Sequence, residues 1–326
     1  MKTLTRLFVA TALTGVIAPA AFAEKWDMPM AYAASNFHSE VGAKFAQCVT
    51  DGTDSEIEIV THPSGSLFPG AQIKRAVQTG QVQIGERLLS AHQNDNVLYG
   101  FDSIPFLATS FDASGTLWEV AKPTIEEALA SENLTLLYSV PWPPQGFYSR
   151  DEVTSVADME GMKFRSFNNI TTRLAELMNM LPVTIEAAEL SQALATGVAD
   201  AMITSGATGY DRKVWESLNY YYEVDAWLPR NYIIVNSDTW NDVNDDNKGV
   251  IRDCAAAAEA EGLQRSKDYT QFTLDGLREG GMEVGPPSEQ LETDLKGVGA
   301  VLTDEWLEEA GDEGRAIVDA YKAKAE

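Results

Sequence analysis

Arg165 has a type and setting that could bind a carboxylate. The strand expected over Met162 to Phe167 alternates apolar and charged side chains, so Arg165 leaves the core face near the carboxyl end of the strand. A guanidinium group is a planar fork of donors that matches a carboxylate through two parallel hydrogen bonds, and it stays charged when desolvated. The alternative, which the pattern alone favours, is an arginine paired with a surface acid.

Aromatic side chains could supply the wall of a binding site. Trp142 lies in the proline-rich run Pro141-Trp142-Pro143-Pro144, close to Phe147 and Tyr148. Aromatic walls suit flat or apolar ligand bodies, and tryptophan adds a hydrogen-bond donor. The alternative is ordinary packing of a connecting segment.

Motifs that would carry catalysis are absent from the sequence. It contains no GxSxG nucleophile elbow, no P-loop, no dinucleotide-binding glycine pattern and no HExxH. The three histidines are scattered, no CxxC occurs, and neither a metal site nor a cofactor is expected. Acid pairs of the kind that glycosidases use stay open, but they arise everywhere among 49 acidic residues. We therefore expect a protein that is not an enzyme.

Length and charge narrow the class further. The chain has 326 residues, 44% of them hydrophobic, and a net charge of -25. That length can form two ordinary cores. An acidic surface without a Lys/Arg-rich run repels phosphate backbones, so no nucleic-acid partner is expected.

The first 23 residues resemble a secretory signal. Lys2 and Arg6 precede the apolar stretch Leu7 to Ile17, and Ala21-Phe22-Ala23 presents small residues to signal peptidase. A membrane anchor is the alternative, but the apolar run is short for a bilayer. We expect cleavage after Ala23 and a periplasmic mature protein.

Two segments of the chain repeat the order strand, helix, strand, helix, strand. In each, the second helix ends in a Thr-Gly step, at Thr79-Gly80 and Thr196-Gly197. The expected ranges are Lys25 to Tyr32, Ser35 to Gly52, Ile57 to Val60, Ala71 to Thr79 and Val82 to Ile84, and then Met162 to Phe167, Thr171 to Met180, Val183 to Ile185, Ala187 to Thr196 and Val198 to Ile203.

Such units predict an α/β fold with two lobes, each a sheet flanked by helices, with a hinged cleft between them. Leu134 to Val140 would cross from one lobe to the other, and Tyr232 to Asn236 would return. We expect a first lobe over 24–145, a second over 146–229, and a return strand with C-terminal helices packing across the lobes over 230–326. Those helices are expected over Asp245 to Lys267 and Glu289 to Lys324.

Over essentially the whole mature chain, the sequence resembles the solute-binding proteins of tripartite ATP-independent periplasmic (TRAP) transporters, DctP type. The stretches that carry the resemblance are Ala31 to Val49, His62 to Leu67 followed by Lys74 to Gly80, Asp102 to Leu107, Val156 to Arg165, and Ala193 to Ala201. The resemblance implies a two-lobed periplasmic binding protein, type II-like, that closes on an organic acid and delivers it to a membrane permease. Arg165 matches the arginine that pairs with the substrate carboxylate in this family.

The resemblance also implies further ligand contacts. They fall at Phe37, Glu86, Arg87, Asn168 and Thr204. Glu86 could accept hydroxyl hydrogens from a ligand or pair with Arg87. Some members carry a second arginine in the stretch before Arg165, but this chain reads Pro144-Gln145-Gly146-Phe147-Tyr148 there, with Arg150 several residues later. Trp142 and Gln145 complete the expected ligand contacts.

With one arginine clamp and aromatic walls, we expect the ligand to be a monocarboxylate with an apolar or aromatic portion rather than a dicarboxylate. We also expect the protein to be a monomer. Two alternative functions stay open: a periplasmic sensor that presents the acid to a membrane receptor, and a structural or scavenging envelope protein.

Cys48 and Cys254 are the two cysteines of the chain. In an oxidising compartment a single pair has only each other as partners, which favours a disulfide. The alternative is two small buried hydrophobes, since bridging needs Cα atoms within about 7 Å.

Overall fold

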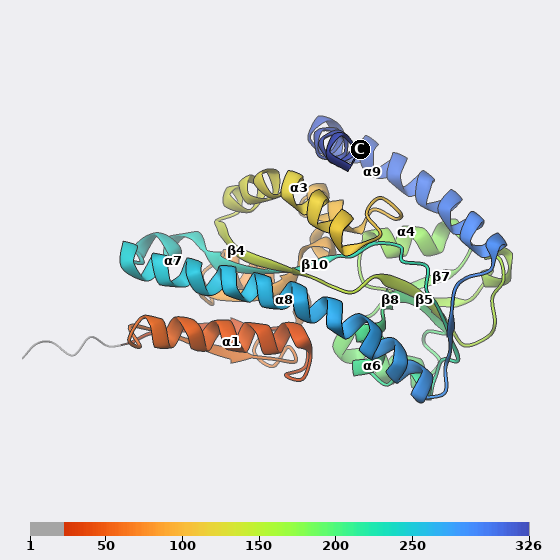
Figure 1. The fold of residues 1–326 in the computed structure, drawn as a ribbon, viewed down its shortest axis with the longest axis horizontal. Coiled ribbons are helices and arrows are strands. Elements are labelled where there is room, and N and C mark those ends of the chain that lie inside the picture. The colour runs from red at the N-terminus through yellow and green to blue at the C-terminus, as the bar shows by residue number, and fades with distance from the viewer. Residues whose placement is uncertain (1–22, 326) are drawn as a thin grey trace, which may run out of the picture.

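The computed structural model describes residues 23–325, so the expected signal segment 1–22 lies outside the described residues. The described chain forms two lobes, each with helices around a sheet (Figure 1). The long helices α8 (Asp245–Glu279) and α9 (Glu289–Ala325) extend over both lobes. Within 23–325, no helix is both long and apolar enough to cross a membrane.

The first repeated unit forms the beginning of the first lobe. Its strands and helices are β1 (Glu24–Pro29), α1 (Phe37–Gly52), β2 (Ile57–His62), α2 (Gly70–Gln78) and β3 (Ile84–Leu88). Strand β1 pairs in parallel with β2, and a parallel bridge between Met30 and Glu86 links it to β3. Val41, Phe45 and Val49 are buried, which confirms the apolar face expected for the first helix.

The second lobe contains the second unit together with strands and helices on either side of it. Its strands and helices are β5 (Gln145–Ser149), β6 (Lys163–Ser166), α4 (Asn169–Leu177), β7 (Leu181–Thr184), α5 (Leu190–Ala195), β8 (Ala201–Ser205), α6 (Gly206–Asp211) and β9 (Tyr220–Tyr222). The sheet has the order β11-β9-β5-β8-β6-β7, where β11 is Glu283–Gly285. Strand β6 pairs in parallel with β7 and β8, as expected, whereas β5 is antiparallel to β8 and β9.

Two segments connect the lobes and lie against each other. Helix α3 (Phe111–Ser131) leads into β4 (Leu134–Pro141), and residues 142–144 then cross to β5. The chain returns through residues 223–229 to β10 (Arg230–Asn236), which lies antiparallel between β3 and β4. The backbone N–H of Trp142 donates to Pro229 O at 2.7 Å, and that of Gln145 donates to Trp227 O at 3.0 Å.

The third strand of each unit begins later than the sequence predicts. The expected strands Val82 to Ile84 and Val198 to Ile203 are observed as β3 and β8, which begin at Ile84 and Ala201. In both units the Thr-Gly step has a left-handed glycine, with φ of 70° at Gly80 and 68° at Gly197. Gln81 and Val82 still donate to Ala76 O, and Val198 to Ala193 O, so the chain directly after each glycine is bonded to the helix end and not to the sheet.

Several segments extend beyond or differ from the expected elements. Helix α8 continues past the expected end at Lys267 to Glu279, because Leu274 and Leu277 are buried in the core of the second lobe. Helix α9 bends at Gly311, where the backbone is not helical. A short helix, α7 (Ser237–Asp242), follows β10. The 3₁₀ helices are η1 (Leu89–His92), η2 (Val97–Ser103), η3 (Val156–Met159), η4 (Ala187–Glu189) and η5 (Val214–Glu216).

A disulfide joins Cys48 on α1 to Cys254 on α8, with Cα atoms 5.9 Å apart. The expected bridge is therefore present, and it closes a sequence separation of 206 residues. In the chain-entropy account, a loop of that length stabilises the fold by about 5 kcal/mol. The bridge fixes the N-terminal end of α8 to the first lobe, and the far end of the helix reaches α6 in the second lobe.

Candidate functional site

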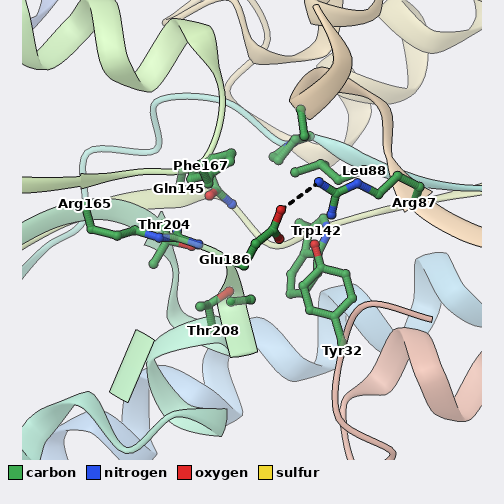
Figure 2. Close-up of a pocket in the computed structure, with 13 residues that line it drawn as sticks. Tyr32, Arg87, Leu88, Trp142, Gln145, Arg165, Phe167, Glu186, Thr204 and Thr208 are labelled. Carbon is green, nitrogen blue, oxygen red and sulfur yellow. Dashed lines mark hydrogen bonds and ion pairs between the residues drawn. The ribbon is translucent and has the colours of Figure 1, made fainter. Parts of the chain in front are cut away.

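A pocket lies where the two lobes and their connecting segments meet (Figure 2). It holds about 440 Å³ of space between protein atoms, its open mouth included. Most of the lining residues lie at or just beyond the ends of strands of both lobes, as expected for a cleft in this kind of fold. They are Tyr32, Arg87, Leu88, Ala91, Trp142, Gln145, Arg165, Phe167, Glu186, Ala187, Thr204, Thr208 and Pro229.

Arg165 enters the pocket from β6 of the second lobe. Its neighbour Phe164 is buried in the core, so the strand alternates as predicted and directs Arg165 to the other side. The Arg165 side chain donates from Nε to Ile185 O at 3.0 Å, and its guanidinium lies 5.1 Å from the centre of the Phe167 ring.

Within the described residues the buried Arg165 guanidinium forms no ion pair, although the Glu186 charge acts on it in the same pocket. The residue is 3% exposed. Burial lowers its pKa to about 10, so the side chain stays cationic at neutral pH. A desolvated charge is stable only when another group compensates it, and here the pocket is the open direction. Arg165 is therefore arranged to receive an anion.

Arg87 enters the same pocket from β3 of the first lobe, and its polar atoms already have partners. Its Nη2 lies 3.2 Å from Glu186 Oε1, and its Nε donates to His92 Nε2 at 3.2 Å. Glu186 follows β7 of the second lobe, so this ion pair connects the two lobes across the cleft.

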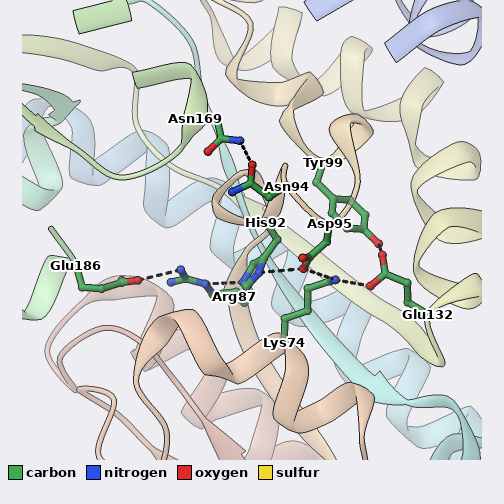
Figure 3. Close-up of polar contacts among 9 residues, drawn as sticks. All are labelled: Lys74, Arg87, His92, Asn94, Asp95, Tyr99, Glu132, Asn169 and Glu186. Carbon is green, nitrogen blue, oxygen red and sulfur yellow. Dashed lines mark hydrogen bonds and ion pairs between the residues drawn. The ribbon is translucent and has the colours of Figure 1, made fainter. Parts of the chain in front are cut away.

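His92 joins Arg87 to a cluster of paired charges (Figure 3). Burial, together with the nearby cations Arg87 and Lys74, lowers the pKa of His92 to about 3, so its imidazole is neutral and can accept from Arg87. Lys74 pairs with Asp95 at 2.9 Å and also with Glu132. Asp95 and Glu132 therefore both pair with Lys74, whereas Glu186 is the carboxylate that pairs with Arg87.

A buried layer supports Trp142 behind the pocket wall. The indole Nε1 donates to Asn231 Oδ1 at 2.8 Å, and Asn231 Nδ2 donates to Glu86 Oε1 at 2.8 Å. Burial raises the pKa of Glu86 to about 7, against the opposing effects of the Asn231 hydrogen bond and the Arg87 charge. Phe37 packs edge-on against Trp142, with ring centres 5.5 Å apart. This layer fixes the orientation of the indole.

The predicted site residues divide into two groups. Arg87, Trp142, Gln145, Arg165 and Thr204 line the pocket together. The other three, Phe37, Glu86 and Asn168, do not line it. Phe37 and Glu86 lie in the layer behind Trp142.

Asn168 acts at the start of α4 rather than in the pocket lining. Its Oδ1 accepts from Thr171 N at 2.9 Å, which caps the helix, and its Nδ2 donates to Ser90 Oγ at 3.1 Å in the first lobe. The cap uses the side-chain oxygen that a ligand would otherwise contact. Arg150, the other arginine considered for a second clamp, pairs with Asp200 at 3.3 Å on the second lobe and does not line the pocket either.

Sequence reasoning missed four polar or aromatic lining residues. Tyr32, Phe167, Glu186 and Thr208 all line the pocket. Tyr32 follows β1, Phe167 follows β6 and Glu186 follows β7, so each could have been found as a side chain just beyond the carboxyl end of a strand. Thr208 lies on α6 and carries no comparable signal. Its place depends on how that helix packs.

The polar groups of the pocket suit the binding of a small ligand. Among the described residues, no group of three or more His, Cys, Asp or Glu side chains could hold a metal ion. Within 23–325, no protein hydrogen bond involves the Thr204 hydroxyl, which is therefore free for a ligand. Two lobes joined by paired connecting segments, with an unpaired arginine in the pocket between them, define an extracytoplasmic solute-binding protein.

Residues 30–309 match the DctP family, described as bacterial extracellular solute-binding protein, family 7, and the chain belongs to this family. The family resemblance expected from the sequence is thus confirmed. The family serves TRAP permeases and consists of solute-binding proteins that bind carboxylates, not enzymes. Its members act outside the cytoplasm.

Solved structures similar to this chain include three receptors for one compound. A TRAP solute-binding protein from a marine metagenome, specific for pyroglutamate, is 51% identical with a TM-score of 0.91, covering 93% of this chain and 100% of that chain. DctP6 of Bordetella pertussis, which binds pyroglutamic acid, is 40% identical with a TM-score of 0.90, covering 92% and 99%. DctP7 of the same organism, also binding pyroglutamic acid, is 36% identical with a TM-score of 0.90, covering 92% and 100%.

Curated relatives are more distant in sequence. The monocarboxylate 2-oxoacid-binding periplasmic protein of Nostoc sp. is 24% identical, covering 77% of this chain and 71% of that protein. The ectoine/5-hydroxyectoine-binding periplasmic protein UehA of Ruegeria pomeroyi is 22% identical, covering 99% and 97%.

Proposed function

We propose that this protein captures pyroglutamate in the cleft between its lobes and delivers it to a TRAP permease. The observation that carries the proposal is the unpaired, buried guanidinium of Arg165 in a small pocket, which fits a ligand with a single carboxylate. Three pyroglutamate-binding receptors that are 36% to 51% identical to this chain support this choice of ligand.

The lining residues offer a partner for each part of this molecule. Its carboxylate would pair with Arg165, and its lactam ring would lie against the aromatic walls Trp142 and Phe167. The lactam carbonyl needs a donor and the lactam N–H needs an acceptor, which Thr204 and Gln145 can supply. This proposal narrows the expected ligand class, a monocarboxylate with an apolar portion, to one cyclic acid.

We also propose that the boundaries of the two lobes are those predicted from the sequence. Lobe 1 would comprise 24–145 and the return strand, lobe 2 would comprise 146–229, and the connecting segments 142–144 and 223–229 would act as the hinge. Cleavage after Ala23 is likewise our proposal. Intact-mass spectrometry of protein secreted to the periplasm tests the cleavage site directly.

A thermal-shift titration tests the ligand. Protein is unfolded, dialysed and refolded to remove co-purified ligand, then heated with pyroglutamate or with 2-pyrrolidinone, which keeps the ring and lacks the carboxylate. A ligand that binds only the folded state stabilises it by about 2.7 kcal/mol at one hundred times its Kd. We expect pyroglutamate to raise the melting temperature and 2-pyrrolidinone to leave it unchanged. A shift with another organic acid but none with millimolar pyroglutamate would exclude this ligand.

Small-angle scattering tests the hinge. Two lobes that close on a ligand as rigid bodies give a smaller radius of gyration when the ligand is bound. We expect that decrease on saturation with pyroglutamate. An unchanged scattering profile at saturation would argue for a rigid site.

A further inference from the structure

Glu186 is an acidic side chain inside a pocket proposed to bind an anion. It lies between the two arginines of the pocket, paired with Arg87 and facing the side from which Arg165 enters (Figure 2). A carboxylate in this position opposes the binding of negative ligands, so it requires a reason beyond affinity.

The Arg87–Glu186 pair is held closely by its surroundings. A Cβ atom added to Gly70, the first residue of α2, would lie 2.8 Å from Arg87 Nη1 and 2.9 Å from Glu186 Oε2. The pair therefore packs against backbone that has no side chain. Arg87 is 4% exposed, and His92 fixes its Nε from the opposite side. Arg87 thus has little freedom to turn to another partner.

No other carboxylate of the described chain neutralises Arg87. Asp95 and Glu132 pair with Lys74, as Figure 3 shows. Glu86 directs Oε1 to Asn231 in the layer behind the pocket. The lining of the pocket therefore carries two cations, Arg87 and Arg165, and one anion, Glu186, which leaves a single positive charge for the ligand.

We propose that Glu186 sets the charge of the ligand: by neutralising Arg87 it leaves Arg165 for one carboxylate and repels a second. The inference rests on the proposed function, because it concerns the same pocket. It explains how a site with two buried arginines selects a monocarboxylate. Specificity of this kind comes from a repulsive element placed against the wrong ligand.

Calorimetric titration of Glu186→Gln with glutarate, a flexible dicarboxylate, tests the inference. Glutamine keeps the size and hydrogen-bonding capacity of the side chain but removes its charge, so the pocket would offer two cations. We expect Glu186→Gln to bind glutarate at least about tenfold more tightly than the wild type, while pyroglutamate affinity changes by a smaller factor. Glu189→Gln is the matched control, because Glu189 is exposed, lies three residues later and does not line the pocket.

The outcomes separate the two proposals. Glutarate affinity within threefold of the wild type in Glu186→Gln, or an equal gain in Glu189→Gln, would overturn the role of Glu186. Failure of the wild type to bind pyroglutamate would instead reject the proposed ligand, and the glutarate comparison would still decide the role of Glu186. Circular dichroism melting establishes that each variant folds. Glu186→Ala, a second uncharged replacement, must change glutarate affinity in the same direction.

Discussion

The two buried arginines of the pocket differ in the partners that the protein gives them. Arg165 has a backbone acceptor at Ile185 and an aromatic face at Phe167, whereas Arg87 has the carboxylate of Glu186 and the imidazole of His92. Both are less than 5% exposed, so burial does not distinguish them. The difference is the counter-charge. In our proposal, the desolvated cation without a counter-charge binds the ligand carboxylate, whereas the one with a counter-charge stabilises the structure.

This contrast shows how a binding site can hold more charge than its ligand uses. Arg87 adds an ion pair across the cleft, between β3 of the first lobe and the end of β7 of the second. Arg165 adds a buried cation without a counter-charge, which a ligand carboxylate would supply. Changing either arginine should therefore weaken binding for a different reason and by a different amount.

Arg165→Ala should have the largest effect on binding. Removing one partner of a buried ion pair costs about 3 to 5 kcal/mol, which corresponds to a loss of affinity of at least about a hundredfold. Arg173→Ala is the control, because Arg173 lies exposed on α4 and pairs with Glu305 away from the pocket. Calorimetry with pyroglutamate measures both variants. Affinity within threefold of the wild type in Arg165→Ala would show that the two arginines had been assigned the wrong way round.

Glu86→Gln should change the pH dependence of stability. Burial raises the pKa of Glu86 from an ordinary value of 4.5 to about 7, so the folded state holds its proton over a range in which the unfolded state has lost it. The proton-linked stability of the wild type relative to the variant is therefore full below pH 4.5 and is lost as the pH rises through 7. The total change is on the order of 3 kcal/mol.

Urea unfolding at pH 5 and pH 8 measures this difference. His38, 3.9 Å from Glu86, works in the opposite direction, because burial lowers its pKa and charging it at low pH favours unfolding. Comparison of the wild type with Glu86→Gln largely separates the two groups. Glu58→Gln, an exposed change on β2, should follow the wild type. A parallel pH profile for the Glu86 variant would mean that Glu86 is ionised and shares Arg87 with Glu186.

Arg87→Ala should weaken pyroglutamate binding by about ten- to a hundredfold, less than Arg165→Ala. The substitution removes the ion pair between the lobes and leaves the Glu186 carboxylate facing the ligand without compensation. If repulsion by Glu186 is the main cause, adding Glu186→Gln to the Arg87 variant should restore part of the affinity. Calorimetry on the single and double variants measures the coupling. Purely additive losses would contradict this account of the pair.

Thr204→Val should have the smallest effect, a loss of about three- to tenfold in affinity. Its hydroxyl faces the pocket, and a neutral hydrogen bond to a ligand contributes about 1 kcal/mol. Valine preserves the branched shape in strand β8. Thr61→Val on β2, outside the pocket, is the control. A loss as large as that of Arg165→Ala would mean that the hydroxyl, rather than the guanidinium, dominates recognition.

The family, the two repeated units and much of the site could be predicted from the amino-acid sequence. Alternation in the strand around Phe164 placed Arg165 on the side away from the core, and the family resemblance pointed to Arg87 and Thr204. These features depend on local geometry, because neighbouring residues of a strand face opposite sides and strand ends share one edge of a sheet. The presence of one pair of cysteines in an exported chain likewise favoured the bridge between Cys48 and Cys254.

Which residues face each other across the cleft could not be predicted from the sequence and is known from the folded structure. Arg87 and Glu186 are 99 residues apart in the chain, and no local pattern relates them. Glu86 and Phe37 were expected at the ligand, but packing places them one layer behind the pocket wall. There Glu86 accepts a hydrogen bond from Asn231, and the Phe37 ring packs against Trp142. Pairing of charges depends on distance in space and on burial. Both are set when the two lobes and the long helices α8 and α9 pack together, and not by the sequence near each charge.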